Sequence, residues 1–374
     1  MRVVFACAGT GGHINPAIAI AKNIIKQDSK SKILFIGTEK GMENDLVKNA
    51  SFKIKHVHAD KILREFTLKN IKALYSNVKG ISDAKKILKD FKADLVIGTG
   101  GYICIPVMLA AKSLKIKYLL HESNAYPGVS VKLLAKNSDG VMLGFKEAEK
   151  RITPKCNNKI YTGTPIKFFK EEYEKLDKKE CRKELGIPIT KKVVLVSGGS
   201  LGALSFGETV INIFKKYKDD ERLKDSHYIL ITGEKNYQTV IDKIKEAKIE
   251  SKNLEVKKFV YDMDKMYKSA DIAVTRSGAL TINELIMTKT PSVLIPYPYA
   301  AENHQFFNAN VLASKDAAEI ILQKELTEDV LYSKINNILF DTNRIKNIKN
   351  TLEEIYVDDV DDRIYKVIKN TIEK

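Results

Sequence analysis

The sequence predicts an α/β protein built from two domains, each a doubly wound parallel sheet with helices on both faces. Its 374 residues suffice for two domains of ordinary size. Short apolar or β-branched runs alternate with longer amphipathic stretches, as in right-handed strand–helix–strand crossovers. This alternation starts twice, each time with a strand, a glycine-rich loop and a helix. Because such sheets bind ligands at the carboxyl ends of their strands, we expect the two halves to face each other across a cleft.

The expected strands are the short apolar runs, and the segments between them are expected to be helical. In the first half they are residues 2–6, 32–36, 94–97, 117–120 and 140–143. In the second half they are residues 192–196, 228–232, 255–259, 272–275 and 292–296. The charged stretch 167–182 is expected to be a surface connection. We place domains at 1–163 and 164–343, followed by a charged helical segment, 344–374, that can cross back to the first half.

Composition excludes several classes of protein. A hydrophobic content of 44% predicts a folded chain, and a formal charge of +16 favours an anionic partner such as nucleic acid, a membrane surface or a phosphorylated substrate. A lysine-rich surface can also reflect a general amino-acid bias of the organism's proteome. The sequence shows no basic tail, zinc-finger spacing or aromatic–basic strand pattern, so we expect no nucleic acid as partner.

Cysteine spacing and hydropathy indicate the compartment. The four cysteines are far apart and form no CxxC pair, which favours a reducing environment and argues against a structural metal. No apolar run approaches the roughly 20 residues that span a bilayer, and the first apolar run is too short for a signal peptide. We therefore expect a soluble, intracellular protein.

Three glycine-rich loops follow predicted strands, at residues 9–13, 98–102 and 197–203. The main-chain N–H groups of such loops, together with a helix N-terminus, can bind an anion or a polar sugar group. The first loop is neither a dinucleotide fingerprint, because Ile14 replaces the last glycine, nor a phosphate loop with its lysine. A tight turn without a ligand is the alternative for each loop.

The stretch from Thr275 to Glu284 is the most informative one. A strand runs into a loop of small residues and then a helix that carries Glu284, whose carboxylate can accept hydrogen bonds from both ribose hydroxyl groups. Glu284 can also be an ordinary solvated helix residue. Arg276 can meet a phosphate or hold the loop in place. The Asp262–Asp264 pair resembles a metal-binding DxD motif, but we interpret it as helix capping and surface charge.

Seven motifs together resemble the MurG family of GT-B glycosyltransferases. They are GTGGHxNPA from Gly9, GTGGYxxxP from Gly98, HESNxxPG from His121, TGTP from Thr162, GGSLGA from Gly198, SGALTINE from Ser277 and ENHQFFNA from Glu302. The resemblance covers residues 3 to about 315. It implies two Rossmann-like domains and inverting transfer of N-acetylglucosamine (GlcNAc) from UDP-GlcNAc to the 4-hydroxyl of undecaprenyl-pyrophosphoryl-MurNAc-pentapeptide (lipid I), giving lipid II for peptidoglycan.

The resemblance also implies which residues bind the substrates. The second domain would bind UDP-GlcNAc and the first the acceptor, without a metal or other cofactor. The implied nucleotide-sugar contacts are Ser200 to the diphosphate, main chain near Val260 to uracil, Ala279, Leu280 and Thr281 to the phosphates, Glu284 to the ribose and Gln305 to the sugar. The implied contacts from the opposite wall are Thr10, Gly11, Gly12 and Asn124.

This chain departs from the family pattern at several positions. Lys167 stands where the family usually has arginine, and it keeps the charge but loses the two-pronged hydrogen-bonding geometry. The preceding Thr164 replaces an asparagine. Ala8 replaces a glycine and Ser123 a glutamine, differences that concern loop structure rather than mechanism.

His13 is the candidate general base for the acceptor hydroxyl, because histidine is the side chain whose ordinary pKa lies nearest pH 7 and His13 lies on the first glycine loop, which is expected to face the cleft. A structural hydrogen bond or a contact to the acceptor diphosphate is the alternative. Helix N-termini and loop N–H groups would stabilise the leaving UDP. Other readings of the whole chain are a related glycosyltransferase with another lipid acceptor and a UDP-GlcNAc 2-epimerase.

A lipid-linked acceptor implies a peripheral location on the cytoplasmic side of the plasma or inner membrane. Apolar residues Ile71, Leu74, Tyr75, Val78 and Ile81 fall at helical spacing. Lysines flank them at positions 69, 72, 79, 85 and 86. Such a face can lie on an anionic membrane surface, although a buried core face is the commoner meaning of the pattern.

Overall fold

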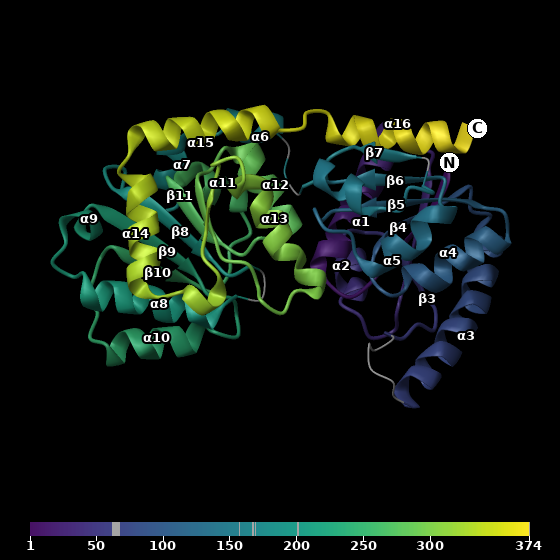
Figure 1. The fold of residues 1–374 in the computed structure, drawn as a ribbon, viewed down its shortest axis with the longest axis horizontal. Helices are drawn as coiled ribbons and strands as arrows, with labels where there is room; N and C mark the ends of the chain where they lie inside the picture. Colours follow the sequence, from purple (N-terminus) through teal and green to yellow (C-terminus); the bar gives the residue numbers. More distant parts are fainter. Residues whose placement is uncertain (62–67, 157, 167, 169, 200–201, 374) are drawn as a thin grey trace. The chain divides into compact units, whose positions relative to one another are not determined.

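The computed structural model describes residues 1–61, 68–156, 158–166, 168, 170–199 and 202–373. The chain divides into two compact units: unit 1 is Met1–Lys167 with Val357–Lys374, and unit 2 is Phe168–Tyr356. Each unit contains one parallel sheet covered by helices (Figure 1). The predicted fold class, two doubly wound α/β domains, is confirmed. The functional domains proposed from the sequence stay a prediction.

The sheet of unit 1 has the order β3-β2-β1-β4-β5-β6-β7, and its strand pairs are parallel. The strands are β1 (Arg2–Cys7), β2 (Lys32–Gly37), β3 (Lys53–His56), β4 (Leu95–Gly100), β5 (Lys117–Glu122), β6 (Gly140–Leu143) and β7 (Lys159–Tyr161). Both faces of the central strands are buried, which explains their continuous apolar runs.

Alternate residues of β1 point into two different cores of unit 1. Val3 and Phe5 join the core formed with α1, α2 and α16, whereas Val4 and Ala6 join the core formed with α3, α4 and α5. The helices are α1 (Gly11–Gln27), α2 (Glu43–Asn49), α3 (Leu68–Phe91), α4 (Cys104–Ser113), α5 (Val129–Leu134) and α16 (Val360–Glu373). Two 3₁₀ segments are η1 (Ala135–Asn137) and η2 (Lys146–Arg151).

Unit 2 repeats this topology with the strand order β10-β9-β8-β11-β12-β13. The strands are β8 (Lys192–Ser197), β9 (Ser226–Ile231), β10 (Leu254–Lys257), β11 (Ile272–Thr275), β12 (Ser292–Leu294) and β13 (Glu319–Ile320). The helices are α6 (Lys170–Lys175), α7 (Lys178–Glu184), α8 (Leu204–Lys216), α9 (Glu221–Lys224), α10 (Tyr237–Glu246), α11 (Met263–Ser269), α12 (Ala279–Thr288), α13 (His304–Ala313), α14 (Glu328–Leu339) and α15 (Thr342–Ile355), with η3 (Ala301–Asn303) and η4 (Gln323–Glu325).

The structure corrects the strand assignments at the sheet edges. Strands β3, β7 and β13 were not expected, because they are short and only partly buried and so lack an apolar run. Strand β4 continues to Gly100, so the second glycine motif starts inside the strand rather than after it. The ten predicted strands all correspond to observed ones, with ends that differ by a few residues.

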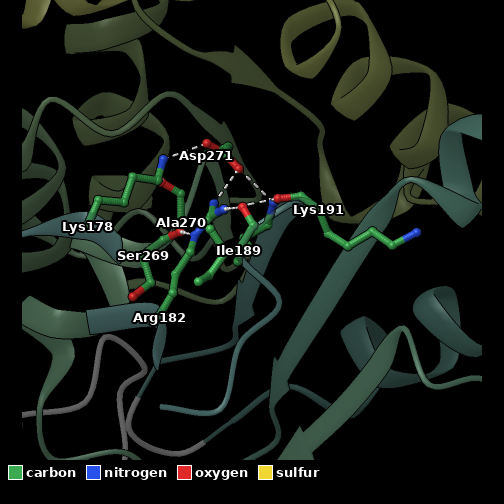
Figure 2. A network of polar contacts seen from close by, with 8 residues as sticks. Lys178, Arg182, Ile189, Lys191, Ser269, Ala270 and Asp271 are labelled. Atoms are coloured by element: carbon green, nitrogen blue, oxygen red, sulfur yellow. Dashed lines mark hydrogen bonds and ion pairs between the residues drawn. The ribbon is translucent and has the colours of Figure 1, made fainter. Parts of the chain in front are cut away.

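The stretch 167–182 is not a surface connection, and that expectation was wrong. Its described part forms α6 and most of α7, which pack on α11 of unit 2. Arg182 is buried, and its guanidinium group donates to Asp271 Oδ2 at 2.7 Å and to the carbonyl oxygen of Ser269 at 3.0 Å. Asp271 also accepts from Lys178 at 2.6 Å and from the N–H of Val193 at 2.7 Å (Figure 2). This network fixes α7 to the amino-terminal ends of β8 and β11.

Helix α3 packs on α4 (Figure 1). It leaves four apolar side chains exposed to solvent. Ile71, Leu74, Tyr75 and Val78, which we call the α3 apolar face, are 67%, 59%, 73% and 58% exposed. The core-face interpretation is therefore wrong for these four, although Ile81 does pack against the core. Lys79 and Lys86 on the same helix are exposed, whereas the side chains of Lys69 and Lys72 lie outside the described residues.

Candidate active site

The first glycine loop joins β1 to α1 and holds His13 in the first turn of the helix. Gly9 has a φ of +101°, a left-handed conformation that favours glycine. Thr10 and Gly12 are exposed, and Gly11 and His13 are half-buried. The first turn contains no acidic side chain, so the positive end of the helix dipole is not offset there. The loop therefore presents N–H groups and an imidazole at the carboxyl edge of the sheet.

The second glycine loop packs directly against the first. Strands β1 and β4 are neighbours, and Cys7 pairs with Gly100 in their register. A Cβ atom on Gly100 would lie 2.5 Å from Cδ2 of His13, and one on Gly101 would overlap the carbonyl oxygen of Ala8. Thr99 Oγ1 donates to the carbonyl oxygen of His13 at 2.7 Å. The glycines of this motif are needed for close packing around His13, a role that composition alone does not reveal.

The tautomer of His13 is indicated by one hydrogen-bonding contact of its ring. His13 Nδ1 lies 3.2 Å from the carbonyl oxygen of Ala8. Because a carbonyl oxygen only accepts hydrogen bonds, Nδ1 carries the proton in the neutral ring and the lone pair is on Nε2. This tautomer suits a general base that takes a proton at Nε2.

The loop after β5 is organised by Glu122, which the sequence analysis did not single out. The buried carboxylate accepts from the N–H of Asn124 at 2.9 Å, from Asn124 Nδ2 at 2.9 Å and from the N–H of Gly128 at 2.7 Å. Burial raises the pKa of Glu122, although these hydrogen bonds oppose the rise. Asn124 is thus held in one orientation at the same sheet edge as His13, with β4 between their strands.

His121 serves the structure of unit 1. Its ring is fully buried, with Nε2 at 3.4 Å from the carbonyl oxygen of Gly163 and Nδ1 at 3.3 Å from Ser123 Oγ. Burial lowers the pKa of His121 to about 4, so the ring is neutral at pH 7. It links the loop after β5 to the segment after β7.

In unit 2, α12 begins at the carboxyl end of β11, in the loop of small residues. Gly278 is the N-cap in extended conformation, Ala279 is buried, and Leu280 and Thr281 are half-buried. The main chain next to Ala279 is fixed by Ser277. Ser277 Oγ donates to the carbonyl oxygen of Gln305 at 2.8 Å, which ties the start of α12 to α13.

Gln305 belongs to the same cluster of loops. Its Oε1 accepts from the N–H of Tyr297 at 3.0 Å, so the side chain bridges the loop after β12. The nearby residues Glu302 and Asn303 have φ values of +53° and +52°, which are uncommon for residues other than glycine. Such strained conformations are often kept at binding sites.

Glu284 lies in the second turn of α12 and is positioned by a tyrosine. The hydroxyl group of Tyr267, on α11, donates to Glu284 Oε2 at 3.1 Å. Tyr267 is buried, and burial raises its pKa well above the usual range, with the negative charge of Glu284 acting in the same direction. Tyr267 was missed because one tyrosine in an amphipathic helix carries no motif.

Arg276 holds a loop, one of its two expected roles. Its Nη1 donates to the carbonyl oxygen of Ile295 at 3.0 Å. The guanidinium group lies 4.6 Å from the ring centre of Phe206 and 5.5 Å from that of Tyr297. Burial lowers the pKa of Arg276 to about 10, so it remains charged at pH 7.

The remaining expected residues are placed as follows. Val260 is half-buried after β10, and β9 and β8 lie between its strand and β11. Ser200 and Lys167 lie outside the described residues. Asp262 occupies the N-cap of α11 but its side chain makes no capping hydrogen bond, so the capping interpretation was wrong. Across the described residues, no three His, Cys, Asp or Glu side chains are grouped as a metal site requires.

Comparison with known proteins identifies both units. Residues 3–143 match the glycosyltransferase family 28 N-terminal domain, and residues 193–363 match the family 28 C-terminal domain. A relative from Acetivibrio thermocellus is 40% identical over 370 residues, which are 99% of this chain and 98% of the relative. One from Finegoldia magna is 35% identical and covers 99% of both chains. Both are named UDP-N-acetylglucosamine--N-acetylmuramyl-(pentapeptide) pyrophosphoryl-undecaprenol N-acetylglucosamine transferase.

Solved structures agree with this assignment. The crystal structure of MurG from Acinetobacter baumannii is 26% identical, covers 99% of both chains and superposes with a TM-score of 0.76. The kitacinnamycin glycosyltransferase, at 15% identity and a TM-score of 0.73 over 99% of both chains, shares the fold. The family resemblance that the seven motifs predicted is confirmed: this chain belongs to the MurG family of GT-B glycosyltransferases.

Proposed function

We infer that the protein transfers GlcNAc from UDP-GlcNAc to the 4-hydroxyl of the MurNAc-pentapeptide of lipid I, with inversion from α to β, and so forms lipid II for peptidoglycan. Full-length similarity to transferases of that name carries the inference. The geometry of the site is compatible with it. Each sheet presents glycine-rich or small-residue loops and a helix N-terminus at its carboxyl edge, which suits a sugar nucleotide bound through main-chain N–H groups.

His13 is the proposed general base. With Nδ1 donating to Ala8, Nε2 is the nitrogen that accepts the proton of the attacking 4-hydroxyl. The hydroxyl oxygen then forms the new bond to the anomeric carbon while the bond to UDP breaks. Replacing His13 with Ala is expected to lower kcat by at least about a hundredfold, the ordinary contribution of general base catalysis, with little change in UDP affinity. Near-normal turnover in this variant would remove His13 as the base.

The second domain, 164–343, is proposed to bind UDP-GlcNAc. The start of α12, with Ala279, Leu280 and Thr281, would stabilise the diphosphate charge that grows as UDP leaves. Glu284 would accept from the ribose hydroxyl groups in the orientation that Tyr267 gives it. Ser200 is proposed for the diphosphate, main chain near Val260 for uracil and Gln305 for the sugar hydroxyl groups.

The first domain, 1–163, is proposed to bind the acceptor and to face the transferred sugar. Thr10, Gly11, Gly12 and Asn124 are the proposed contacts on this side. Lys167, near the start of the second proposed domain, is proposed as a further contact to substrate because of its charge.

The decisive experiment is transfer of labelled GlcNAc to a short-chain lipid-linked muramoyl-pentapeptide. We expect labelled disaccharide product, and UDP release that depends on the acceptor. UDP release without acceptor, accompanied by a 2-epimer of the sugar, would support epimerisation instead. Full activity in a chelator is expected, because the proposed leaving-group stabilisation comes from N–H groups and helix dipoles; loss of activity that Mg²⁺ or Mn²⁺ restores would contradict that mechanism.

We further propose that the α3 apolar face, defined above by Ile71, Leu74, Tyr75 and Val78, docks on an anionic membrane. Contiguous exposed apolar side chains on one helix face are unusual in a protein that contacts only water. Full burial of each is worth roughly 1.5 kcal/mol or more, and nearby lysines add attraction to anionic lipid. Among the described residues, no helix is long and apolar enough to cross a membrane.

We include two neighbouring helices in the proposed docking surface, because they also expose apolar side chains. Helix α4, which packs on α3, exposes Leu109, and α5, which contacts α4, exposes Val129 and Leu133. Lys112 on α4 is exposed as well. The proposed docking surface thus combines apolar and basic side chains from three helices of unit 1.

Sedimentation with liposomes tests the membrane proposal. The double variant Leu74→Glu, Tyr75→Glu is expected to lose binding to vesicles that contain phosphatidylglycerol, while Ile189→Glu, an exposed apolar position of unit 2, serves as the matched control. Binding should weaken as salt rises from about 0.1 M to about 1 M, over which the screening length falls from about 10 Å to about 3 Å. Equal binding by both variants would contradict the proposal.

A further inference from the structure

The peptide group between Ala8 and Gly9 has hydrogen-bonding partners at both ends. Its N–H, which belongs to Gly9, donates to Glu43 Oε2 at 3.4 Å. Its carbonyl oxygen, which belongs to Ala8, accepts from Nδ1 of His13 at 3.2 Å. A carboxylate and the imidazole are therefore connected through a single peptide group, all within unit 1.

Glu43 is built firmly into this position. It is fully buried at the start of α2, and its Oε1 accepts from the N–H of Thr38 at 2.9 Å and from Thr38 Oγ1 at 2.7 Å. A Cβ atom on Gly41 would overlap the carboxylate, and one on Gly37 would lie 2.7 Å from Cγ of Glu43. Two glycines thus leave the space that the side chain occupies. A buried carboxylate without hydrogen-bond donors is costly, so its orientation is constrained by the donors around it.

We propose that Glu43 is a positioning residue for His13, acting through the Ala8–Gly9 peptide group. By accepting from the Gly9 N–H, the carboxylate polarises the peptide group and makes the Ala8 oxygen a stronger acceptor, because linked hydrogen bonds strengthen one another in a low-dielectric interior. A stronger Nδ1–H···O hydrogen bond holds the tautomer with its lone pair on Nε2. The effect parallels that of a carboxylate bonded directly to a catalytic histidine. The proposal rests on the proposed role of His13 as base and adds a residue outside the seven motifs named above.

Other titratable groups near Glu43 do not supply this effect. Cys7 on β1 interacts electrostatically with Glu43 and with Cys104 on α4. Burial raises the pKa of both thiols, that of Cys104 to about 12. Both are therefore protonated and neutral in the range in which an enzyme of this kind is assayed.

Nitrogen NMR of the protein labelled with ¹⁵N-histidine tests the proposal directly. The ring signals of His13 are identified by their loss in His13→Gln, and spectra are taken at about pH 8, above the ordinary histidine range. We expect wild-type His13 to be the Nδ1–H tautomer. In Glu43→Gln, where the amide group can place a donor against the Gly9 N–H, we expect less of this tautomer. A wild-type Nε2–H tautomer overturns the proposal, whatever the variants do.

Kinetics with a matched control separate positioning from folding. Asn44→Ala loosens the same turn, because Asn44 Nδ2 donates to the carbonyl oxygens of Thr38 and Gly41, both at 2.9 Å. We expect Glu43→Gln to lower kcat about 10-fold or more and to change KM for UDP-GlcNAc by less than about twofold. Losses of this size are typical when a residue that orients a site residue, without contacting the ligand, is replaced. We expect Asn44→Ala to retain kcat. Equal losses in both variants, or an unchanged tautomer in Glu43→Gln, overturn the proposal.

The two readouts also separate this proposal from the proposed function. The tautomer is a property of the protein without substrate, so it is measured even if transfer to lipid I fails. Conversely, if transfer requires His13 but not Glu43, the proposed function is supported and the positioning role of Glu43 is contradicted.

Discussion

Removing one buried hydroxyl group, in Tyr267→Phe, is expected to weaken UDP binding without unfolding unit 2. The hydroxyl donates to Glu284 Oε2 at 3.1 Å. Burial and the adjacent carboxylate raise the pKa of Tyr267, so the phenol is protonated and the hydrogen bond persists at any ordinary assay pH. Phenylalanine keeps the ring in place, so the substitution opens no large cavity in the packing of α11 against α12.

The expected size follows from the kind of hydrogen bond. A hydrogen bond to a charged group contributes about 1.5–3 kcal/mol. Part of this free energy is recovered in the variant, because Glu284 can adopt another rotamer and accept hydrogen bonds from water. UDP binding must then restore the orientation that Tyr267 had supplied. We expect this to cost about 1 kcal/mol, or about a fivefold rise in Kd.

Isothermal titration with UDP measures the effect, with Tyr173→Phe as the matched control. Tyr173 is also buried in unit 2, and its hydroxyl donates to the carbonyl oxygen of Thr288, the last residue of α12, at 3.3 Å. Both variants should lower Tm by similar amounts, but only Tyr267→Phe should raise Kd. An unchanged Kd in Tyr267→Phe would refute the argument that the orientation of Glu284 serves nucleotide binding.

Two further predictions concern the stability of the units. Asp271→Asn is expected to destabilise unit 2 by about 3 kcal/mol, because Arg182 then stays buried without its carboxylate partner. Burial acts to raise the pKa of the Asp271 carboxyl, but its ion pairs and hydrogen bonds outweigh burial, so the pKa lies below its ordinary value of 3.8. When the pH falls below about 4, the carboxylate becomes protonated and this contribution to stability is lost. In that pH range, Tm of the wild type should fall more steeply than Tm of Asp271→Asn. The four cysteines are buried, so iodoacetamide should modify them slowly in the native protein and completely after unfolding, as mass spectrometry would show; rapid native labelling would contradict the packing around Cys7 and Cys104.

The central strands and the site loops could be predicted from the sequence because each leaves a local signal. Strands buried on both faces require continuous apolar residues, and tight strand-to-helix loops require glycine where φ is positive or another chain segment comes close. Gly9 and Gly100 are examples of the second requirement. Edge strands such as β3, whose sequence alternates lysine with apolar and polar residues, leave no such signal.

Two of the errors share a different cause, since both concern contacts between elements that are distant in the sequence. Arg182 and Asp271 look like solvated charges in the sequence, but 89 residues apart they form one buried ion pair. The periodicity of α3 fits a core face and a membrane face equally well, and only the packing of α3 on α4 shows that Leu74 and Tyr75 point away from the core. Helical period identifies a face but not what covers it.

Two loops of unit 1 are each held by a buried carboxylate. Glu43 accepts from the N–H of Gly9, and Glu122 accepts from the N–H groups of Asn124 and Gly128. Under the proposed function each loop must be rigid, because a general base or a sugar contact misplaced by about 1 Å costs much of the rate. The proposed ligand then lies on the outer side of each loop, so the protein can hold the loop only from its inner side. A buried carboxylate does this, since it accepts from N–H groups that point inward and leaves the outward-pointing groups for the proposed ligand.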